Sequence, residues 1–216
     1  RTGARRSSRF ARRISMQRDN STFRSKAKLR KKALAMLDAP CVMETHGGYG
    51  AIYDECYRSS DIPGVVFEKN PVKADALAKQ RPTWAVYECD CVAAIAEGVG
   101  FHIPVNLFDI DPYGSPWDVI DAILSQGDKL PSTVVMAVND GLRQKVQING
   151  GWDVEQLSAA VRYFGASSMY RKYLEVCEFL LQQKAVEAGY ALDRFGGYYC
   201  GHGDNMTHYA ALLRRV

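Results

Sequence analysis

The chain lacks several features that would place it in well-known protein classes. No apolar run approaches the ~20 residues that a membrane-spanning helix needs. The basic N-terminus has no apolar core of the kind that a secretory signal carries. The six cysteines include no two CxxC pairs at zinc spacing. We therefore expect no membrane partner and an intracellular, cytoplasmic protein with free thiols. Cys89 and Cys91 share one strand face without further ligands, so we expect no metal site.

Acidic residues are almost absent from the first 32 positions. These positions hold 13 Lys or Arg and one acid, Asp19, whereas the rest of the 216-residue chain holds 15 basic and 23 acidic residues. Basic arms bind phosphate backbones by releasing counterions. We assign residues 1–24 to such an arm, with nucleic acid, RNA or DNA, as the expected partner. A solubilising tail, a targeting signal or an expression remnant is the alternative. The candidate contacts are Arg5, Arg6, Arg9, Arg12 and Arg13.

Short apolar runs alternate with helical patterns through most of the chain. Strands are expected at residues 41–44, 65–68, 84–90, 105–111 and 133–138. Helices are expected at residues 25–37, 51–58, 71–79, 92–97 and 116–125. This alternation predicts a parallel sheet with right-handed crossovers.

The C-terminal third has a different pattern. Glycines interrupt residues 141–170, which we interpret as an irregular segment and a possible substrate-recognition insert. A helix is expected at residues 170–187. Two strands, at 190–195 and 207–213, flank a turn that contains Gly203, Asp204 and Asn205, which predicts a terminal antiparallel hairpin.

Acidic residues recur at the expected strand ends. Glu44, Glu68, Asp90 and Asp111 are separated by 24, 22 and 21 residues, one strand and one helix apart each time. Carboxyl ends of parallel strands meet at one sheet edge, where open α/β sheets bind ligands. We therefore expect these carboxylates to gather at a single ligand site.

The segment from Glu44 to Gly50 links the first strand to its helix. Glycines there permit a sharp turn and close approach of a ligand, and the helix N-terminus offers free N–H groups. Glu-x-x-Gly-Gly-x-Gly at this place resembles motif I of the class I S-adenosylmethionine (SAM) methyltransferases, with His46 where that family has a small residue.

This resemblance covers about residues 38–216 and implies a fold and a cofactor. The expected fold is an α/β, Rossmann-like three-layer sandwich over residues 25–216, with a seven-stranded mixed sheet and a C-terminal antiparallel hairpin. The expected cofactor is S-adenosyl-L-methionine. The resemblance implies that Glu68 binds the ribose and Asp90 the adenine amine, while Asp109 holds the methionine amine or orients the glycine loop. The remaining expected cofactor-binding residues are Glu44, His46, Gly47, Gly48, Gly50 and Cys91.

The segment from Asp109 to Pro116 reads Asp-Ile-Asp-Pro-Tyr-Gly-Ser-Pro. It is similar to motif IV of the tRNA (guanine-N2) dimethyltransferases and, more loosely, to the corresponding motif of other amino-methylating nucleic-acid enzymes. The resemblance implies methylation of an exocyclic base amine, with Asp111, Pro112 and Tyr113 as the catalytic residues. Asp111 and the Pro112 carbonyl can accept the two N–H groups of the amine, and Tyr113 can stack on the base.

Other functions fit parts of the pattern. A methyltransferase acting on a protein or a small molecule suits the acidic body of the chain. A SAM-binding, non-catalytic subunit is a second alternative, which the intact Asp-Pro-Tyr sequence disfavours. A nicotinamide-dependent oxidoreductase is disfavoured because the chain has no GxGxxG motif.

Overall fold

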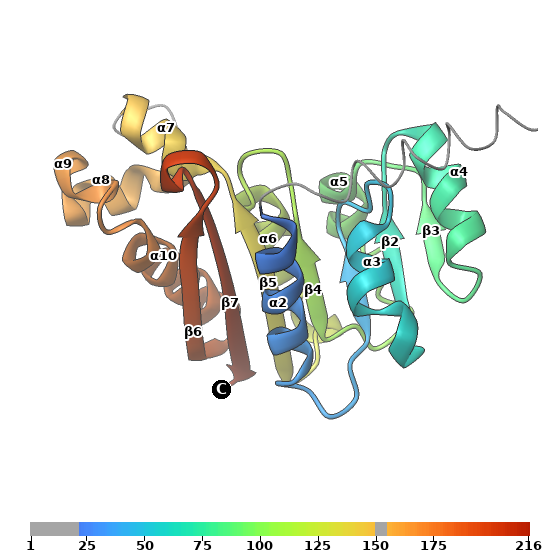
Figure 1. Cartoon of the computed structure of the whole chain (residues 1–216). Helices are drawn as coiled ribbons and strands as arrows, with labels where there is room; N and C mark the ends of the chain where they lie inside the picture. Colours follow the sequence, from blue (N-terminus) through green and yellow to red (C-terminus); the bar gives the residue numbers. More distant parts are fainter. Residues whose placement is uncertain (1–21, 150–154) are drawn as a thin grey trace, which may run out of the picture.

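The computed structural model describes residues 22–149 and 155–216 (Figure 1). The five arginines assigned to nucleic-acid binding in the basic arm lie outside this part of the chain. The described residues form one seven-stranded sheet with the order β3-β2-β1-β4-β5-β7-β6. Its strands are β1 (Val42–Glu44), β2 (Gly64–Phe67), β3 (Ala85–Tyr87), β4 (Leu107–Ile110), β5 (Thr133–Asp140), β6 (Tyr190–Cys200) and β7 (Met206–Arg215).

The sheet is mixed, as the sequence predicted. Strands β1 to β5 are parallel, β7 runs antiparallel to β5, and β6 pairs antiparallel with β7. The predicted C-terminal hairpin is therefore confirmed. The strand order reverses at β1, which lies between β2 and β4, and such switch points open a crevice at the carboxyl ends of the strands.

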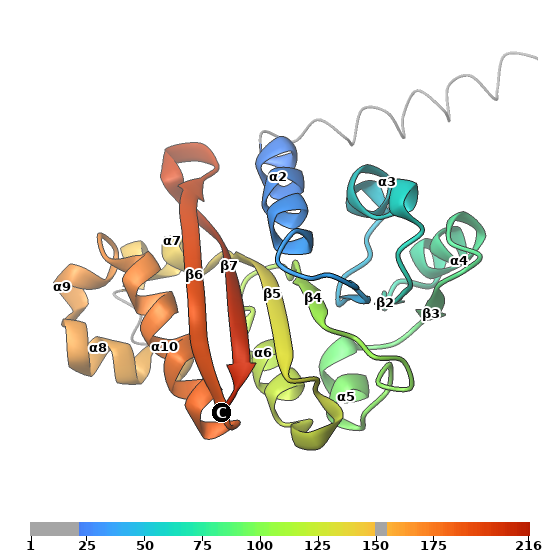
Figure 2. The same cartoon turned by 90° about the horizontal axis from the view of Figure 1, so that it is seen from below.

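Helices cover both faces of the sheet (Figure 2). One face carries α2 (Phe23–Leu34), α3 (Ala51–Cys56) and α4 (Pro71–Gln80); the other carries α5 (Cys91–Ala96), α6 (Trp117–Leu124) and α10 (Tyr173–Glu187). In the described part of the chain, four short 3-10 helices lie in connections: η1 (Arg58–Ser60), η2 (Gly127–Lys129), η3 (Glu155–Leu157) and η4 (His202–Asp204). Across residues 22–149 and 155–216, no helix combines the length and apolar character needed to cross a membrane.

Alternation along the strands divides the core into two clusters. Met43 and Phe108 belong to the cluster under α5, α6 and α10, whereas their neighbours Val42 and Leu107 belong to the cluster under α2 and α3. Successive side chains of a strand point to opposite faces, so the buried strands are apolar on both sides. This explains why the parallel strands appear in the sequence as continuous apolar runs.

Helices occupy much of the segment at residues 141–170 that the structure describes, which the sequence did not indicate. Its described part contains α7 (Leu142–Asn149), α8 (Ser158–Phe164) and α9 (Ala166–Met169). Gly165 ends α8 with a φ of 75° and starts α9. The glycines therefore mark breaks between short helices. The prediction of an irregular segment was wrong for these residues.

Candidate functional site

The loop after β1 lies at the carboxyl edge of the sheet, and its glycines have different roles. Gly48 and Gly50 have φ values of 55° and 79°, a region that L side chains rarely adopt. Gly47 has no room for a side chain, because a Cβ there would lie 2.5 Å from Leu77. The space beside Gly48 is open, with no atom within 4 Å of an added Cβ. The loop is therefore tight against the sheet at Gly47 and open to a ligand at Gly48.

Glu68 follows β2 and holds this loop in place. Its Oε2 accepts a hydrogen bond from the Gly48 N–H at 2.9 Å, and its Oε1 accepts one from the Asn70 N–H at 2.9 Å. The side chain remains half-buried. Glu68 thus lies beside the open face of the glycine loop.

Asp90 and Cys91 follow β3 at the start of α5. Asp90 is the N-cap of that helix, and its Oδ1 accepts from the N–H groups of Val92 and Ala93. The residue is exposed, and its Oδ2 makes no hydrogen bond within the described part of the chain. Burial raises the pKa of Cys91 to about 12, so its thiol is neutral at physiological pH.

His46 connects the glycine loop to α5. One ring nitrogen lies 2.8 Å from the Thr45 hydroxyl and the other lies 3.7 Å from the Cys91 sulfur. Burial lowers the pKa of His46, so the ring is neutral at pH 7. It therefore adds a flat, uncharged surface beside the loop.

Glu44, at the end of β1, lies beneath the loop rather than on its open side. It is 4% exposed and forms a buried ion pair with Arg81. The Arg81 guanidinium packs over the rings of Tyr53 and Trp84, with its central carbon 4.3 Å and 5.1 Å from their centroids. Burial raises the pKa of Glu44, and Arg81 opposes that effect. Arg81 was not singled out from the sequence.

Asp109, on β4, is also buried, with 2% of its surface exposed. Its Oδ1 accepts hydrogen bonds from Arg30 at 2.6 Å and 2.9 Å, and its Oδ2 accepts one from the Tyr57 hydroxyl at 2.7 Å. Both carboxylate oxygens therefore have protein partners. Arg30 comes from α2 and also donates to Asn139 of β5 at 2.9 Å, so it ties α2 to two strands.

Asp111 lies just beyond β4 and is less enclosed. The Lys26 ammonium, also from α2, donates to both of its oxygens at 2.9 Å, and the Asn139 amide donates to it as well. Burial acts to raise the pKa of Asp111, but the charges of Lys26 and Arg30 outweigh it and the pKa falls below its ordinary value. Asp111 is therefore a carboxylate at neutral pH and accepts N–H donors.

Tyr113 lies two residues after Asp111 and has a fully exposed side chain, at 111% of its reference surface. Pro112, between them, is half-buried. Gly114 has a φ of 108° and its carbonyl accepts from the Gly141 N–H, which fixes the turn to the end of β5. The turn after β4 thus carries a charged hydrogen-bond acceptor, Asp111, and an exposed aromatic ring, Tyr113.

The structure adds partners that sequence reasoning missed. Lys26, Arg30, Tyr57 and Asn139 all bond to the two acids of the Asp109–Asp111 segment. Only Asn139 had a sequence signal, because it directly follows the fifth expected strand, residues 133–138. α2 begins at Phe23, two residues inside the range assigned to the basic arm.

The Arg30–Asp109 pair can be tested by replacing Arg30 with Met. Removing one partner of a buried ion pair leaves an uncompensated charge, which costs about 3–5 kcal/mol. We expect Arg30→Met to lower the free energy of unfolding by that amount in urea titrations. Lys31→Met is the matched control, because Lys31 is the next residue of α2 and pairs at the surface with Glu55. Equal losses in the two variants would contradict the role of Arg30.

Comparisons with known proteins identify the fold. No family model matches the sequence, and no curated protein matches it. Among solved structures, Trm1 from Pyrococcus horikoshii in complex with S-adenosyl-L-methionine is similar, with a TM-score of 0.61 and 11% identity. The match covers 89% of this chain and 55% of that one, so the chain spans about half the length of Trm1.

Two further structures are similar over more of their own length. M. jannaschii TYW2 in complex with AdoMet has a TM-score of 0.54 at 12% identity, covering 92% of this chain and 78% of that one. The plantazolicin methyltransferase BpumL, in complex with a desmethylPZN analogue and SAH, has a TM-score of 0.58 at 11% identity, covering 99% and 93%. This chain therefore has the Rossmann-like fold of these methyltransferases.

Proposed function

We propose that the protein is a SAM-dependent methyltransferase that methylates an exocyclic amine of a nucleobase in RNA or DNA. The observation that carries this proposal is the turn after β4. There, the ionised Asp111 already accepts two hydrogen bonds from a nitrogen donor, the Lys26 ammonium, and Tyr113, two residues later, has a fully exposed ring. An amine acceptor and a stacking ring at one sheet edge suit an aromatic amine.

The residues around the glycine loop fit SAM as the cofactor. Glu68 lies at the end of β2, where it can accept the ribose hydroxyls, as acids do in Rossmann folds. Asp90 has a carboxylate oxygen free to accept the adenine amine. Open space beside Gly48 leaves room for the ligand against the loop. The cofactor supplies an electrophilic methyl group when bound.

Glu44 and Asp109 are buried at the strand ends next to this site and hold the strand ends in position. Asp109 uses both oxygens on Arg30 and Tyr57, which disfavours a direct bond to the methionine amine and favours positioning of the strand end. Glu44 is held by Arg81 in the same way. His46 and Cys91, both neutral, contact each other between the glycine loop and α5, where the adenine would bind.

Asp111 and Pro112 would bind and activate the amine that is methylated. The lone pair of an exocyclic base amine is delocalised into the ring, which makes the nitrogen a poor nucleophile. Two acceptors, the Asp111 carboxylate and the Pro112 carbonyl, favour a pyramidal nitrogen with a localised lone pair. The amine takes the place of the Lys26 ammonium at Asp111, one N–H donor for another. Its proton then passes to Asp111 or to water.

Tyr113 holds the base itself. A ring that is fully exposed has no protein surface to stack on, and base–aromatic stacking contributes about 1–3 kcal/mol per base. A base within a duplex has to leave the stack to reach such a ring. The exposed position of Tyr113 is therefore compatible with a flipped or single-stranded base.

A second candidate substrate is a peptide or small molecule. It is favoured by the match to BpumL, a plantazolicin methyltransferase that is covered over 93% of its length, whereas Trm1 is covered over 55%. The acidic charge of residues 33–216 also suits a substrate that is not a polyanion. The site chemistry at Asp111 would be the same, because it depends on the amine alone.

The cofactor site can be tested with conservative amide substitutions. Asp90→Asn keeps an N-cap acceptor for α5 but removes the negative charge that would accept the adenine amine. Glu68→Gln likewise removes the negative charge that would accept the ribose hydroxyls. We expect each to weaken SAM binding by tenfold or more in calorimetry, about 1.4 kcal/mol or more. Glu88→Gln is the control, because Glu88 is exposed and directly follows β3, two residues before Asp90. Unchanged SAM affinity in Asp90→Asn and Glu68→Gln would refute the assignment.

The amine site can be tested with Asp111→Asn. The variant loses the charged acceptor and the route for the proton, and general acid–base groups contribute typically 10²–10⁴-fold to rate. We expect methyl transfer to RNA or DNA to fall by about 100-fold or more while SAM binding is retained. Asp128→Asn, at a fully exposed carboxylate, should have wild-type turnover. Retained turnover in Asp111→Asn would overturn the catalytic assignment.

A further inference from the structure

Helix α2 carries far more positive charge than its packing uses. Its twelve residues include six Lys or Arg and no acid. Arg30 and Lys26 bond to the acids at the site, which leaves four basic side chains on the outer face of the helix. These are Arg24, Lys28, Lys31 and Lys32.

Three of these residues form a row along the helix. Arg24, Lys28 and Lys32 are spaced four apart, so they lie one above the other. Like charges at this spacing destabilise a helix by about 0.2–0.5 kcal/mol per pair. In the described residues none of the three has an ion-pair partner, whereas Lys31 pairs with Glu55 at 2.5 Å. The row therefore opposes folding slightly, and no ion pair among residues 22–149 and 155–216 compensates for it.

A groove runs along one side of this row, between α2 and the β6–β7 hairpin. Its volume is about 620 Å³, and Lys28 and Lys32 line one wall while Arg194 and Tyr198 line the other. No acidic residue lines it. The groove on the opposite side of α2 includes Glu55. In Figure 1, α2 lies in front of β4 and β5, and no described helix covers the hairpin on that side.

The floor of the groove is open at Gly196 of β6. The residue is exposed, and a Cβ built there would meet no atom within 4 Å. Its neighbour Gly197 is different, because a Cβ there would lie 2.7 Å from the His208 carbonyl oxygen. Gly197 is thus required by packing, while Gly196 leaves free space under the basic walls.

One end of the groove lies close to the proposed amine site. Ser25 and Tyr198 both line it, and the residue after Ser25, Lys26, bonds to Asp111. From Ser25 to Leu34, where α2 ends, the helix rises about 14 Å, the length of a few nucleotides. A chain lying in the groove would therefore have its next base close to Lys26 and Asp111.

We propose that this groove, with walls formed by Lys28, Lys32 and Arg194, binds the sugar-phosphate backbone of a single-stranded segment of the nucleic-acid substrate. The inference rests on the proposed function and adds a location for the polymer outside the basic arm. Positive side chains on both walls and an acid-free floor match a narrow polyanion. A flat anionic membrane would contact the helix but not the floor at Gly196.

The test measures binding of the full chain to a fluorescent single-stranded RNA or DNA of about 12 nucleotides, by anisotropy over a range of salt concentrations. Each phosphate contact contributes about 0.7 to the slope of log affinity against log salt. We expect Lys28→Gln with Lys32→Gln to reduce that slope by about 1.4, and affinity at 0.1 M salt by about 25-fold. Gly196→Glu, which places a carboxylate on the groove floor, should also weaken binding, while Gly196→Ser should not.

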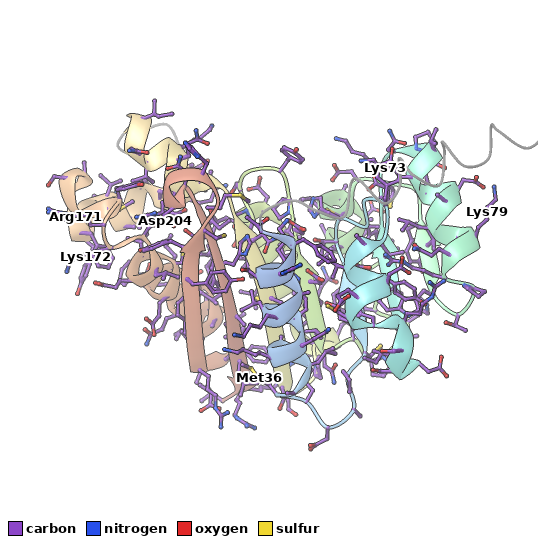
Figure 3. All side chains as sticks on the ribbon, in the orientation of Figure 1. Met36, Lys73, Lys79, Arg171, Lys172 and Asp204 are labelled. Atoms are coloured by element: carbon purple, nitrogen blue, oxygen red, sulfur yellow. The ribbon has the colours of Figure 1, made fainter. Side chains whose placement is uncertain are left out.

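The matched control is Arg171→Gln with Lys172→Gln, which removes the same charge. Figure 3 shows these two residues at the left edge of the molecule, well apart from Met36 at the bottom centre, just after the end of α2. We expect the control to bind as the wild type does. Unchanged affinity and slope in the Lys28/Lys32 variant, or equal losses in the control, would overturn the inference while leaving the proposed function standing.

Two other outcomes would also overturn the assignment of the groove. If the wild-type chain binds no oligonucleotide, both the groove assignment and the nucleobase target fail, although SAM binding by calorimetry can still stand. If vesicles containing phosphatidylserine bind, oligonucleotides do not, and the same variants abolish vesicle binding, the basic row serves a membrane surface instead.

Discussion

The structure depends on the neutralisation of two buried carboxylates that lie side by side. Glu44 and Asp109 are register partners on β1 and β4, the strands at the switch point of the sheet. Two like charges in a buried position are strongly unfavourable unless each is paired. Arg81 pairs with Glu44 and Arg30 pairs with Asp109. One constraint thus fixes α2 and the end of α4 against the carboxyl edge of the sheet.

This arrangement separates the acids of the site into two groups. Glu44 and Asp109 are buried and already paired, so they hold the edge of the sheet in place. Glu68, Asp90 and Asp111 follow their strands by one or more residues and retain exposure, so they can meet a ligand. Because Asn139 bonds to both Arg30 and Asp111, the two groups are connected, and the position of α2 is coupled to the geometry at Asp111.

The sequence predicted most of the fold because its signals are local. Apolar runs of strand length, each ended by an acid, predicted β1 to β4 to within two or three residues at most ends, and the turn at Gly203 predicted the hairpin. Helices α7 to α9 were missed because they are short and separated by glycine. The pairing of Arg30 with Asp109 joins residues 79 apart in the chain, and nothing in the local pattern of α2 indicates which of its six basic residues is buried.

The central claim is that the edge around Asp111 methylates a base amine, and product identification tests it most directly. The full chain would be incubated with labelled SAM and separate pools of RNA, DNA and protein, and the labelled RNA and DNA digested to nucleosides for mass spectrometry. The account predicts label in a nucleoside methylated on its exocyclic nitrogen. Label confined to protein, or to a ring carbon or a ribose oxygen, would contradict it.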